Sequence, residues 1–351
     1  MLFNYIIYFI YLILSVSGLC YLFFGKGIKI SKGLLAVILL LFSFFCVCSV
    51  ITPDWNSYKD MVAELYKSNG KSVTNMEYIW KRASVFVEGN IILFRIFIFF
   101  PSFFFLHKLI CVLLNKEQYL CFLSFFAVLL LYGISGGRQI LAVSMFYYSL
   151  FSPKKILSLA LIVLSIFCHK IVILLFIQYI ISKIITKKHG IILFAILSIT
   201  VLYNIDYIID FVLHLPIEDW GFDFYKYYLS DEILLGEDLP GARRWIYSSY
   251  IFTLSTVLLI LYVVKILNKT SLPYRYMLIY NFLISFLLIF TILYIVGYSE
   301  VAKLRFCAVQ QLPLIFIISY YWDVFKKKIL FVYFVLFVYF VFVNIYISAC
   351  L

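Results

Sequence analysis

The chain has 351 residues, of which 65% are hydrophobic and only 13% are charged, and its mean hydropathy is +1.06. A soluble globular chain of this length does not have that composition, so we expect an integral membrane protein. The formal net charge of +12 comes mostly from short loops, described below, and gives no reason to expect a nucleic-acid partner.

Hydrophobic runs predict an all-α, polytopic membrane protein with about twelve transmembrane helices, forming one membrane domain over residues 1–351. A helix needs about 20 apolar residues to cross a hydrocarbon core of roughly 30 Å. In chain order, the predicted spans are 2–24, 33–51, 91–106, 119–134, 138–152, 156–168, 171–186, 190–208, 245–266, 274–297, 304–321 and 329–349. The first run has no basic n-region and no small-residue cleavage site, which favours a retained helix over a signal peptide.

The Lys and Arg residues of the short loops predict the orientation, because basic residues are retained on the cytoplasmic side. Six alternate connections hold 16 of the 29 basic residues but only Glu117 and Asp323 of the 17 acidic ones. Their basic residues are Lys26, Lys29, Lys32, Lys108, Lys116, Lys154, Lys155, Lys183, Lys187, Lys188, Lys265, Lys269, Arg275, Lys326, Lys327 and Lys328. We therefore expect these connections in the cytoplasm and both termini outside.

Two longer loops, at 52–90 and 206–244, fall on the predicted outer face. The first contains PDWNSYKDMVAELY, which predicts a short helix with Pro53 and Asp54 at its start and aromatic residues on one side. The second is acidic and rich in tyrosine, and its pattern indicates no specific role. Solvated connectors are the alternative interpretation of both loops.

Arg138 follows a glycine-rich break in YGISGGRQILAVSMFYYSL and begins the fifth predicted span, on the face where few basic residues are expected. The fifth and sixth spans have only about 13 to 15 residues, or about 20 Å, so their outer ends are expected to be recessed. The turn with His169 and Lys170 is recessed by the same argument.

A helix N-terminus presents free N–H donors, and an adjacent guanidinium adds a fork of donors that suits phosphate oxygens. Gly136 and Gly137 are expected to leave room for a ligand beside the backbone. We therefore expect Arg138 to bind a phosphate or diphosphate on a membrane-borne chain. The alternative is a snorkelling arginine that fixes the end of a span.

Further polar residues are predicted near the same face. Lys303 and Arg305 begin the eleventh span, with Glu300 nearby, and they add positive charge for an anionic leaving group. His169 is a candidate proton donor, proton acceptor or phosphate partner. A single histidine at a span end is also commonly a structural hydrogen-bonding residue.

The first outer loop contributes acidic candidates. Asp54 and Tyr58 are four residues apart and therefore share one face of the predicted short helix. Glu77 lies in TNMEYIWKR, before the third span. Each carboxylate alone is equally well explained as an ordinary surface residue.

The sequence gives no reason to expect a cofactor or a metal. Its eight cysteines lack metal-ligand or redox spacing, and there is no P-loop, dinucleotide fingerprint or HExxH motif. Neither outer loop contains a DxD motif.

Five elements together resemble the EpsG-like branch of the Wzy polysaccharide polymerases. They are PDWNSYKDM, MEYIW, GGRQILAVSMFYYSLFSPKKIL, SIFCHKIVILLF and AKLRFCAVQ, in order over about residues 50–310. The RQ-x-x-A core, formed by Arg138, Gln139 and Ala142 with a histidine about 30 residues later, is the most specific part.

The resemblance implies a multi-pass enzyme of the bacterial inner membrane, with its active site facing the periplasm or outside. Such an enzyme acts in O-antigen (lipopolysaccharide), capsule or exopolysaccharide biosynthesis and transfers a growing glycan from undecaprenyl diphosphate to a lipid-linked repeat unit. Its partners would be this lipid-linked oligosaccharide and membrane lipid. A chain-length regulator protein is a further candidate partner. The expected catalytic residues are Arg138, His169, Arg305 and Asp54, and the expected substrate-binding residues are Gln139, Lys303, Tyr58, Glu77, Lys170 and Glu300.

Two other functions remain open. A flippase or transporter of lipid-linked oligosaccharide should place polar groups through the depth of the membrane and on both faces, whereas the unexplained ones here are predicted on one face. An O-antigen ligase shares the donor, but the ligases of this kind have one very large outer loop late in the chain. The loop at 206–244 is moderate in length.

Overall fold

The computed structural model describes residues 31–48, 55–71, 76–133, 137–185, 273–295 and 300–322, with a few isolated positions at 13–21 and 253–261. All regular structure in these residues is helical and none of them forms a strand, which confirms the all-α prediction for this part. The chain divides into two compact units, of residues 1–172 with 318–349 and of residues 173–317. The prediction of about twelve spans stays a prediction, because the runs at 190–208 and 329–349 and most of 2–24 and 245–266 lie outside the described residues.

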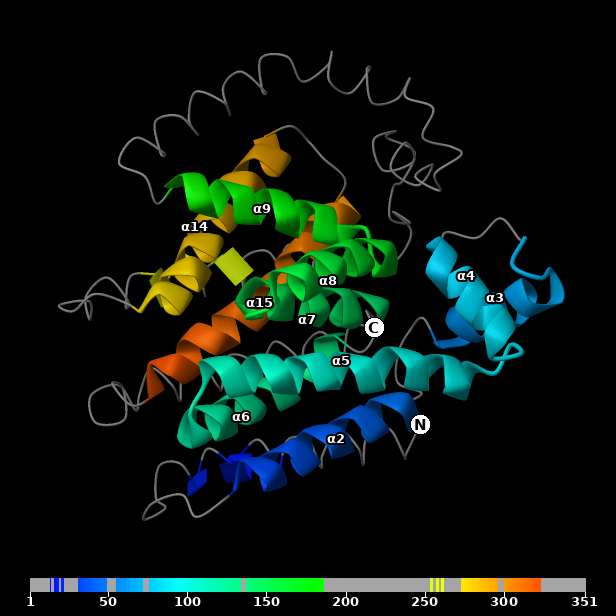
Figure 1. Ribbon diagram of the computed structural model, residues 1–351, viewed down its shortest axis with the longest axis horizontal. Helices are drawn as coiled ribbons and strands as arrows, with labels where there is room; N and C mark the ends of the chain where they lie inside the picture. Colours follow the sequence, from blue (N-terminus) through cyan, green and yellow to red (C-terminus); the bar gives the residue numbers. More distant parts are fainter. Residues whose placement is uncertain are drawn as a thin grey trace, which may run out of the picture. The chain divides into compact units, whose positions relative to one another are not determined.

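Most predicted spans in the described residues are helices (Figure 1). The described helices of the first unit are α2 (Lys32–Cys48), α3 (Trp55–Lys67), α4 (Tyr78–Phe86), α5 (Ile91–Leu113), α6 (Lys116–Gly133), α7 (Gly137–Phe151) and α8 (Lys155–Cys168). The second unit contains all of α14 (Tyr274–Ile295). It also contains most of α9 (Ile171–Ile185) and most of α15 (Glu300–Tyr320). Among the described helices, the stretches Ile91–Leu113 and Tyr274–Tyr294 are long and apolar enough to cross a membrane.

Helix α5 is longer than predicted. Its first turn is capped by Asn90, whose side-chain oxygen accepts hydrogen bonds from the backbone N–H groups of Ile92 and Leu93 at 3.0 and 3.2 Å. The helix then continues beyond the predicted end at residue 106, so Lys108 lies within it and not in a connection. The ammonium of Lys108 lies 5.5 Å from the ring centre of Phe104, and a long basic side chain of this kind is tolerated near the end of an apolar helix.

The first unit is organised around α5, which packs against α2 and α7, while α7 packs against α8 (Figure 1). One side of α5 is buried, and the other exposes Leu93, Phe97, Phe100 and Phe104. These residues are separated by four, three and four positions, so they form one apolar stripe along the helix. Such a stripe is suited to contact with lipid chains.

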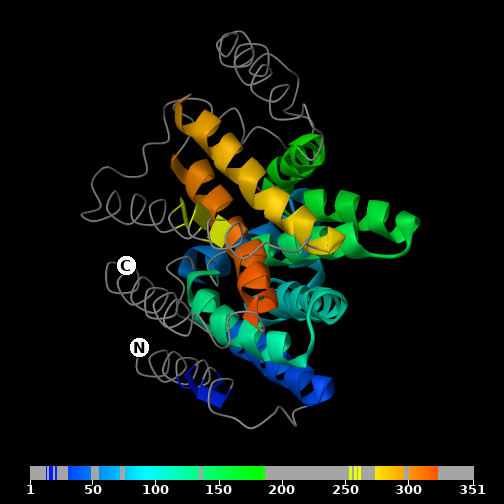
Figure 2. The ribbon, with the colours of Figure 1, turned by 90° about the vertical axis from the view of Figure 1, so that its left-hand side faces the viewer.

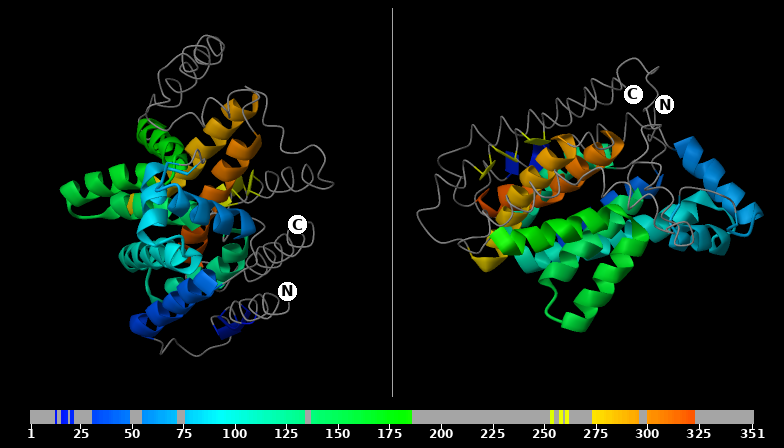
Figure 3. Two further views of the ribbon diagram at one scale, coloured as in Figure 1. Left: turned by 90° about the vertical axis from the view of Figure 1, so that its right-hand side faces the viewer. Right: turned by 90° about the horizontal axis from the view of Figure 1, so that it is seen from above.

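The first outer loop contains two helices, only one of which was predicted. The predicted helix after Pro53 and Asp54 is observed as α3, whereas α4 is an addition; Figure 3 shows the two packed together near one end of α5. Left-handed residues end both helices. Gly70 (φ +76°) follows α3, and Gly89 (φ +73°) follows α4, where an added Cβ would lie 3.2 Å from Cβ of Tyr66.

In the second unit, buried amides join three helices. Nε2 of Gln178 in α9 donates to the carbonyl oxygen of Phe282 in α14 at 2.7 Å and to Oε1 of Gln310 in α15 at 2.9 Å. Gln310 returns a 3.1 Å bond to Gln178. The rings of Phe286 and Phe306 also meet between α14 and α15, which run side by side in Figure 2. Side-chain amides are a common means of joining helices within a membrane.

Candidate functional site

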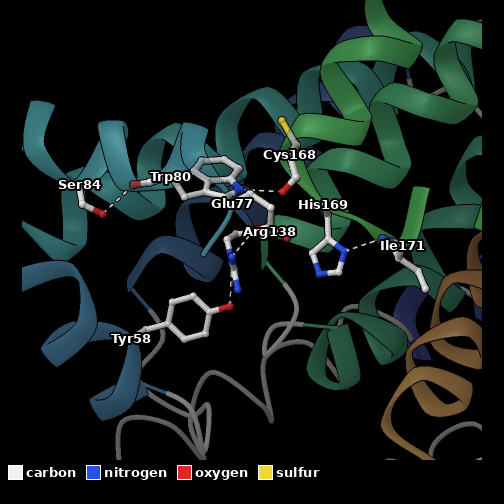
Figure 4. Close-up of polar contacts among 8 residues, drawn as sticks. All are labelled: Tyr58, Glu77, Trp80, Ser84, Arg138, Cys168, His169 and Ile171. Atoms are coloured by element: carbon white, nitrogen blue, oxygen red, sulfur yellow. Dashed lines mark hydrogen bonds and ion pairs between the residues drawn. The ribbon is translucent and has the colours of Figure 1, made fainter. Parts of the chain in front are cut away.

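Arg138 binds residues from two other elements of the first unit (Figure 4). It is the second residue of α7, and its Nη1 forms an ion pair with Oε2 of Glu77, the residue that precedes α4. Its Nε donates a 3.1 Å hydrogen bond to the hydroxyl oxygen of Tyr58 in α3, and its Cζ lies 5.4 Å from the centre of that ring. The structure therefore brings together Tyr58, Glu77 and Arg138, which the sequence singled out separately.

The surroundings of Arg138 fix its guanidinium while leaving it partly accessible. The Arg138 and Glu77 side chains are 12% and 10% exposed. Water screens a charge pair less at this burial than on an open surface, and a charge-assisted hydrogen bond between the two groups is stronger than a neutral one. The ring of Tyr58 adds a cation–π contact on one face of the guanidinium. The guanidinium is therefore held by two partners, a carboxylate that balances its charge and a phenol that orients it.

Trp80, one turn after Glu77, joins α4 to the end of α8. Its indole Nε1 donates a 2.7 Å hydrogen bond to the carbonyl oxygen of Cys168, the last residue of α8 (Figure 4). The Trp80 ring packs edge-on against Phe94 of α5, with ring centres 5.7 Å apart. Helix α4 therefore contacts the start of α7 through Glu77 and the end of α8 through Trp80.

His169 directly follows α8, at the turn that Trp80 contacts. It is buried, and its Nδ1 accepts a hydrogen bond from the backbone N–H of Ile171 at 3.2 Å. Because Nδ1 is the acceptor, the proton of the neutral imidazole lies on Nε2. The predicted break holding His169 and Lys170 between two short helices is confirmed, since α8 ends at Cys168 and α9 begins at Ile171.

The short helices α7 and α8 have the predicted lengths. Helix α7 has 15 residues and α8 has 14, which correspond to about 22 and 21 Å. Both values are below the roughly 30 Å of a hydrocarbon core. Short helices are therefore present where recessed polar residues were predicted.

Gly137 has a different role from the predicted one. It is buried, and a Cβ added to it would lie 3.1 Å from Cζ of Phe99 and 3.3 Å from Cγ2 of Ile98. The space that was expected to receive a ligand beside Gly137 is thus filled by side chains of α5. Gly137 instead permits close packing of α7 on α5.

The remaining predicted residues lie in other parts of the chain, and each is described by its own surroundings. Gln139 is half-buried in α7, and Asp54 lies outside the described residues. In the second unit, α15 begins at Glu300, whose side chain is outside the described part. Lys303 is only 2% exposed, with its ammonium 5.2 Å from the ring centre of Tyr294, and Arg305 is half-buried. The second outer loop, 206–244, also lies outside the described residues.

Two residues in the first unit were missed by the sequence analysis. Trp80 could have been suspected because it lies three positions after Glu77, so that a helix would place both on one side. Arg95 is a charged residue inside a predicted span, a pattern that usually indicates function. Arg95 is buried, and its Cζ lies 5.4 Å from the ring centre of Phe99.

The described residues contain no group of three or more His, Cys, Asp or Glu side chains arranged to hold a metal ion. The polar groups bonded to Arg138 include the carboxylate of Glu77 and the phenol of Tyr58, and the imidazole of His169 lies at the turn that Trp80 contacts. These groups can bind an anion and transfer protons.

The family model described as EpsG family matches residues 33–350. The chain belongs to the EpsG family. The resemblance to the EpsG-like branch, first seen in short motifs, is thereby confirmed over nearly the whole chain. EpsG proteins are membrane-associated, Wzy-like polymerases, a family that implies lipid-linked oligosaccharide substrates. No curated protein and no solved structure matches this EpsG-family chain.

Proposed function

We propose that this EpsG-family protein polymerises a surface polysaccharide from lipid-linked repeat units at the outer leaflet of the bacterial inner membrane. It transfers the growing glycan from undecaprenyl diphosphate to the terminal sugar of the next lipid-linked unit. The observation that supports this proposal most directly is the guanidinium of Arg138, held by Glu77 and Tyr58 at the start of a short helix. Family membership supplies the class of reaction.

The chemistry requires a cation at the leaving group. A hydroxyl oxygen of the acceptor sugar attacks the anomeric carbon of the donor, and the bond from that carbon to the diphosphate oxygen breaks. Negative charge then develops on the diphosphate. The planar donor fork of Arg138 can stabilise this charge through two parallel hydrogen bonds. Tyr58 restrains the plane of the guanidinium through its hydroxyl and its ring.

His169 is proposed to assist the same step. Its Nδ1 is engaged by the backbone of Ile171, so Nε2 is the nitrogen that donates a hydrogen bond when the ring is neutral. Donation to a phosphate oxygen would add to the stabilisation by Arg138. Arg305, with Lys303, is proposed as a further cation of the reaction, and Asp54 as a candidate base.

The remaining predicted groups are proposed to bind sugar or phosphate. Gln139 and Lys170 lie beside Arg138 and His169 in the chain, and Glu300 begins α15. Sugar selectivity is assigned to the tyrosine-rich and acidic loop 206–244, because aromatic rings stack on sugar faces and carboxylates accept hydroxyl hydrogen bonds. No metal and no cofactor is part of the proposed reaction.

One reconstitution experiment separates this function from its rivals. The full-length protein is placed in lipid nanodiscs and supplied with undecaprenyl diphosphate-linked repeat units, and the lipid-linked products are separated by size. A polymerase yields a series of products that differ by one repeat. A flippase leaves the units unchanged, and a ligase extends only a lipid A core acceptor that is added separately.

A further inference from the structure

We infer that Glu77, in place of Asp54, is the group that takes the proton from the acceptor hydroxyl, and that the donor diphosphate releases Glu77 for this task by displacing it from Arg138. This inference rests on the function proposed above. In the structure, Glu77 and Arg138 are paired, so the carboxylate occupies the position at which a phosphate oxygen would bind the guanidinium.

The place of Glu77 in α4 sets it apart from an ordinary helix-capping residue. A residue at the N-cap normally uses its side chain to accept a hydrogen bond from the first turn of its own helix. Glu77 is the N-cap of α4, with extended backbone (φ −60°, ψ 149°), but its side chain makes no such bond. Within the described residues, its carboxylate is hydrogen-bonded to Arg138, 61 residues later in the chain. Capping of α4 therefore does not explain the carboxylate.

A diphosphate competes well for the same guanidinium. It has more negative charge than one carboxylate, and its oxygens match the parallel N–H groups of arginine. When phosphate oxygens take these donors, the Glu77 carboxylate loses its partner at a position where it is only 10% exposed. A carboxylate at low exposure without a hydrogen-bond donor is unfavourable, so it favours a new donor such as the acceptor hydroxyl.

Helix α4 keeps its position when the ion pair opens, because other contacts hold it. Trp80 donates to the carbonyl oxygen of Cys168 and packs on Phe94, and neither contact involves Arg138. The released carboxylate therefore stays next to the bound diphosphate and within reach of the anomeric carbon attached to it.

The resulting step balances. The acceptor O–H gives its proton to a carboxylate oxygen of Glu77, and the acceptor oxygen forms the new bond to the anomeric carbon. The bond between that carbon and the diphosphate oxygen breaks, and its electron pair stays on the diphosphate, next to Arg138. Once the undecaprenyl diphosphate has left, Glu77 gives its proton to water and pairs with Arg138 again. Donor binding thus precedes activation of the acceptor.

This competition predicts opposite effects of one substitution on binding and on turnover. Glu77→Gln keeps the size of the side chain but removes its charge, so the carboxylate no longer competes for Arg138. If the ion pair is closed about nine-tenths of the time, undecaprenyl diphosphate should bind about tenfold more tightly. Polymerisation should fall by about a hundredfold or more, because the proton acceptor is lost. An ion pair that only fixes α4 would not tighten diphosphate binding when it is removed.

The experiment uses full-length protein in nanodiscs, with undecaprenyl diphosphate as the binding probe and a single-turnover polymerisation assay. Glu64→Gln, which removes an exposed carboxylate of α3, is the matched control and should change neither quantity. Glu77→Asp retains the charge but shortens the reach, so it should also bind the diphosphate more tightly while keeping part of the polymerisation. This second variant still tests the inference if Glu77→Gln does not fold.

Tighter diphosphate binding together with lost polymerisation supports the inference. Weaker or unchanged binding in both Glu77 variants overturns it, and so does polymerisation by Glu77→Gln at the wild-type rate. Failure of the wild-type protein to polymerise would instead refute the proposed function. The binding comparison would then still decide whether Glu77 and diphosphate compete for Arg138.

Discussion

The indole of Trp80 donates a 2.7 Å hydrogen bond to the carbonyl oxygen of Cys168, 88 residues later in the chain. This bond fixes α4 against the end of α8, directly before His169. Since Glu77, the N-cap of the same short helix, binds Arg138, this helix contacts Arg138 at one point and the residue before His169 at another.

Replacing Trp80 by Phe should weaken this arrangement. The substitution keeps an aromatic ring against Phe94 but leaves the carbonyl of Cys168 without its donor, and such a loss costs about 1–3 kcal/mol when the group is buried. We expect a lower unfolding temperature and reduced polymerisation, measured on the purified protein. Tyr78→Phe removes a hydroxyl on the exposed side of α4, where Tyr78 is 66% exposed, and should change neither quantity. Equal effects of the two substitutions would contradict this role for Trp80.

Tyr58→Phe tests how far the hydroxyl orients the guanidinium. The variant keeps the ring next to Arg138 but loses the 3.1 Å hydrogen bond, which is worth about 1–2 kcal/mol to a charged donor at partial exposure. We expect polymerisation to fall about five- to thirtyfold while the protein remains folded. Tyr66→Phe, at an exposed position of α3, is the control and should retain the wild-type rate. A wild-type rate for Tyr58→Phe would show that the ring alone suffices.

Gly137→Ala tests the packing of α7 on α5. The added methyl group would meet Phe99 at 3.1 Å and Ile98 at 3.3 Å, and overpacking of this kind costs about 1–3 kcal/mol. The unfolding temperature should fall, and Phe99→Leu in the same chain should restore part of it. Gly33→Ala in α2 is the control, because the nearest atom to a Cβ added there would be Oγ of Ser31, at 3.7 Å. A stabilised Gly137→Ala protein would show that the two helices are not in close contact there.

The lengths of the apolar helices could be predicted because each corresponds to one hydrophobic run. Helices α7 and α8 match their predicted ranges to within one residue at each end. The predicted end of α5 was wrong because His107 and Lys108 interrupt the apolar run, whereas the helix continues through them to Leu113. Polar residues near a span end interrupt the hydropathy pattern without interrupting the backbone hydrogen bonds.

Helix α4 and the pairing of Glu77 with Arg138 could not be predicted in the same way. Only Trp80 and Ser84 of the nine residues in α4 are buried, which is too few to produce a recognisable helical period. The pairing joins residues 61 positions apart, and it depends on the packing of α3 and α4 near the start of α7. No local pattern determines such a contact. The sequence indicated only that Arg138 and Glu77 were each candidates for the site.

The central claim is that Arg138 stabilises the diphosphate leaving group, and the surface polysaccharide of a strain with a substituted gene tests it most directly. Arg138→Ala should remove the long-chain ladder and leave single repeat units, since loss of one preorganised donor group reduces the rate by about 10²–10³. Arg138→Lys should restore little, because an ammonium lacks the planar fork, whereas Arg82→Lys at an exposed position of α4 should give a normal ladder. The comparison requires that the wild-type and variant proteins are present in equal amounts in the membrane fraction. A full ladder from the Arg138→Ala strain would contradict the account.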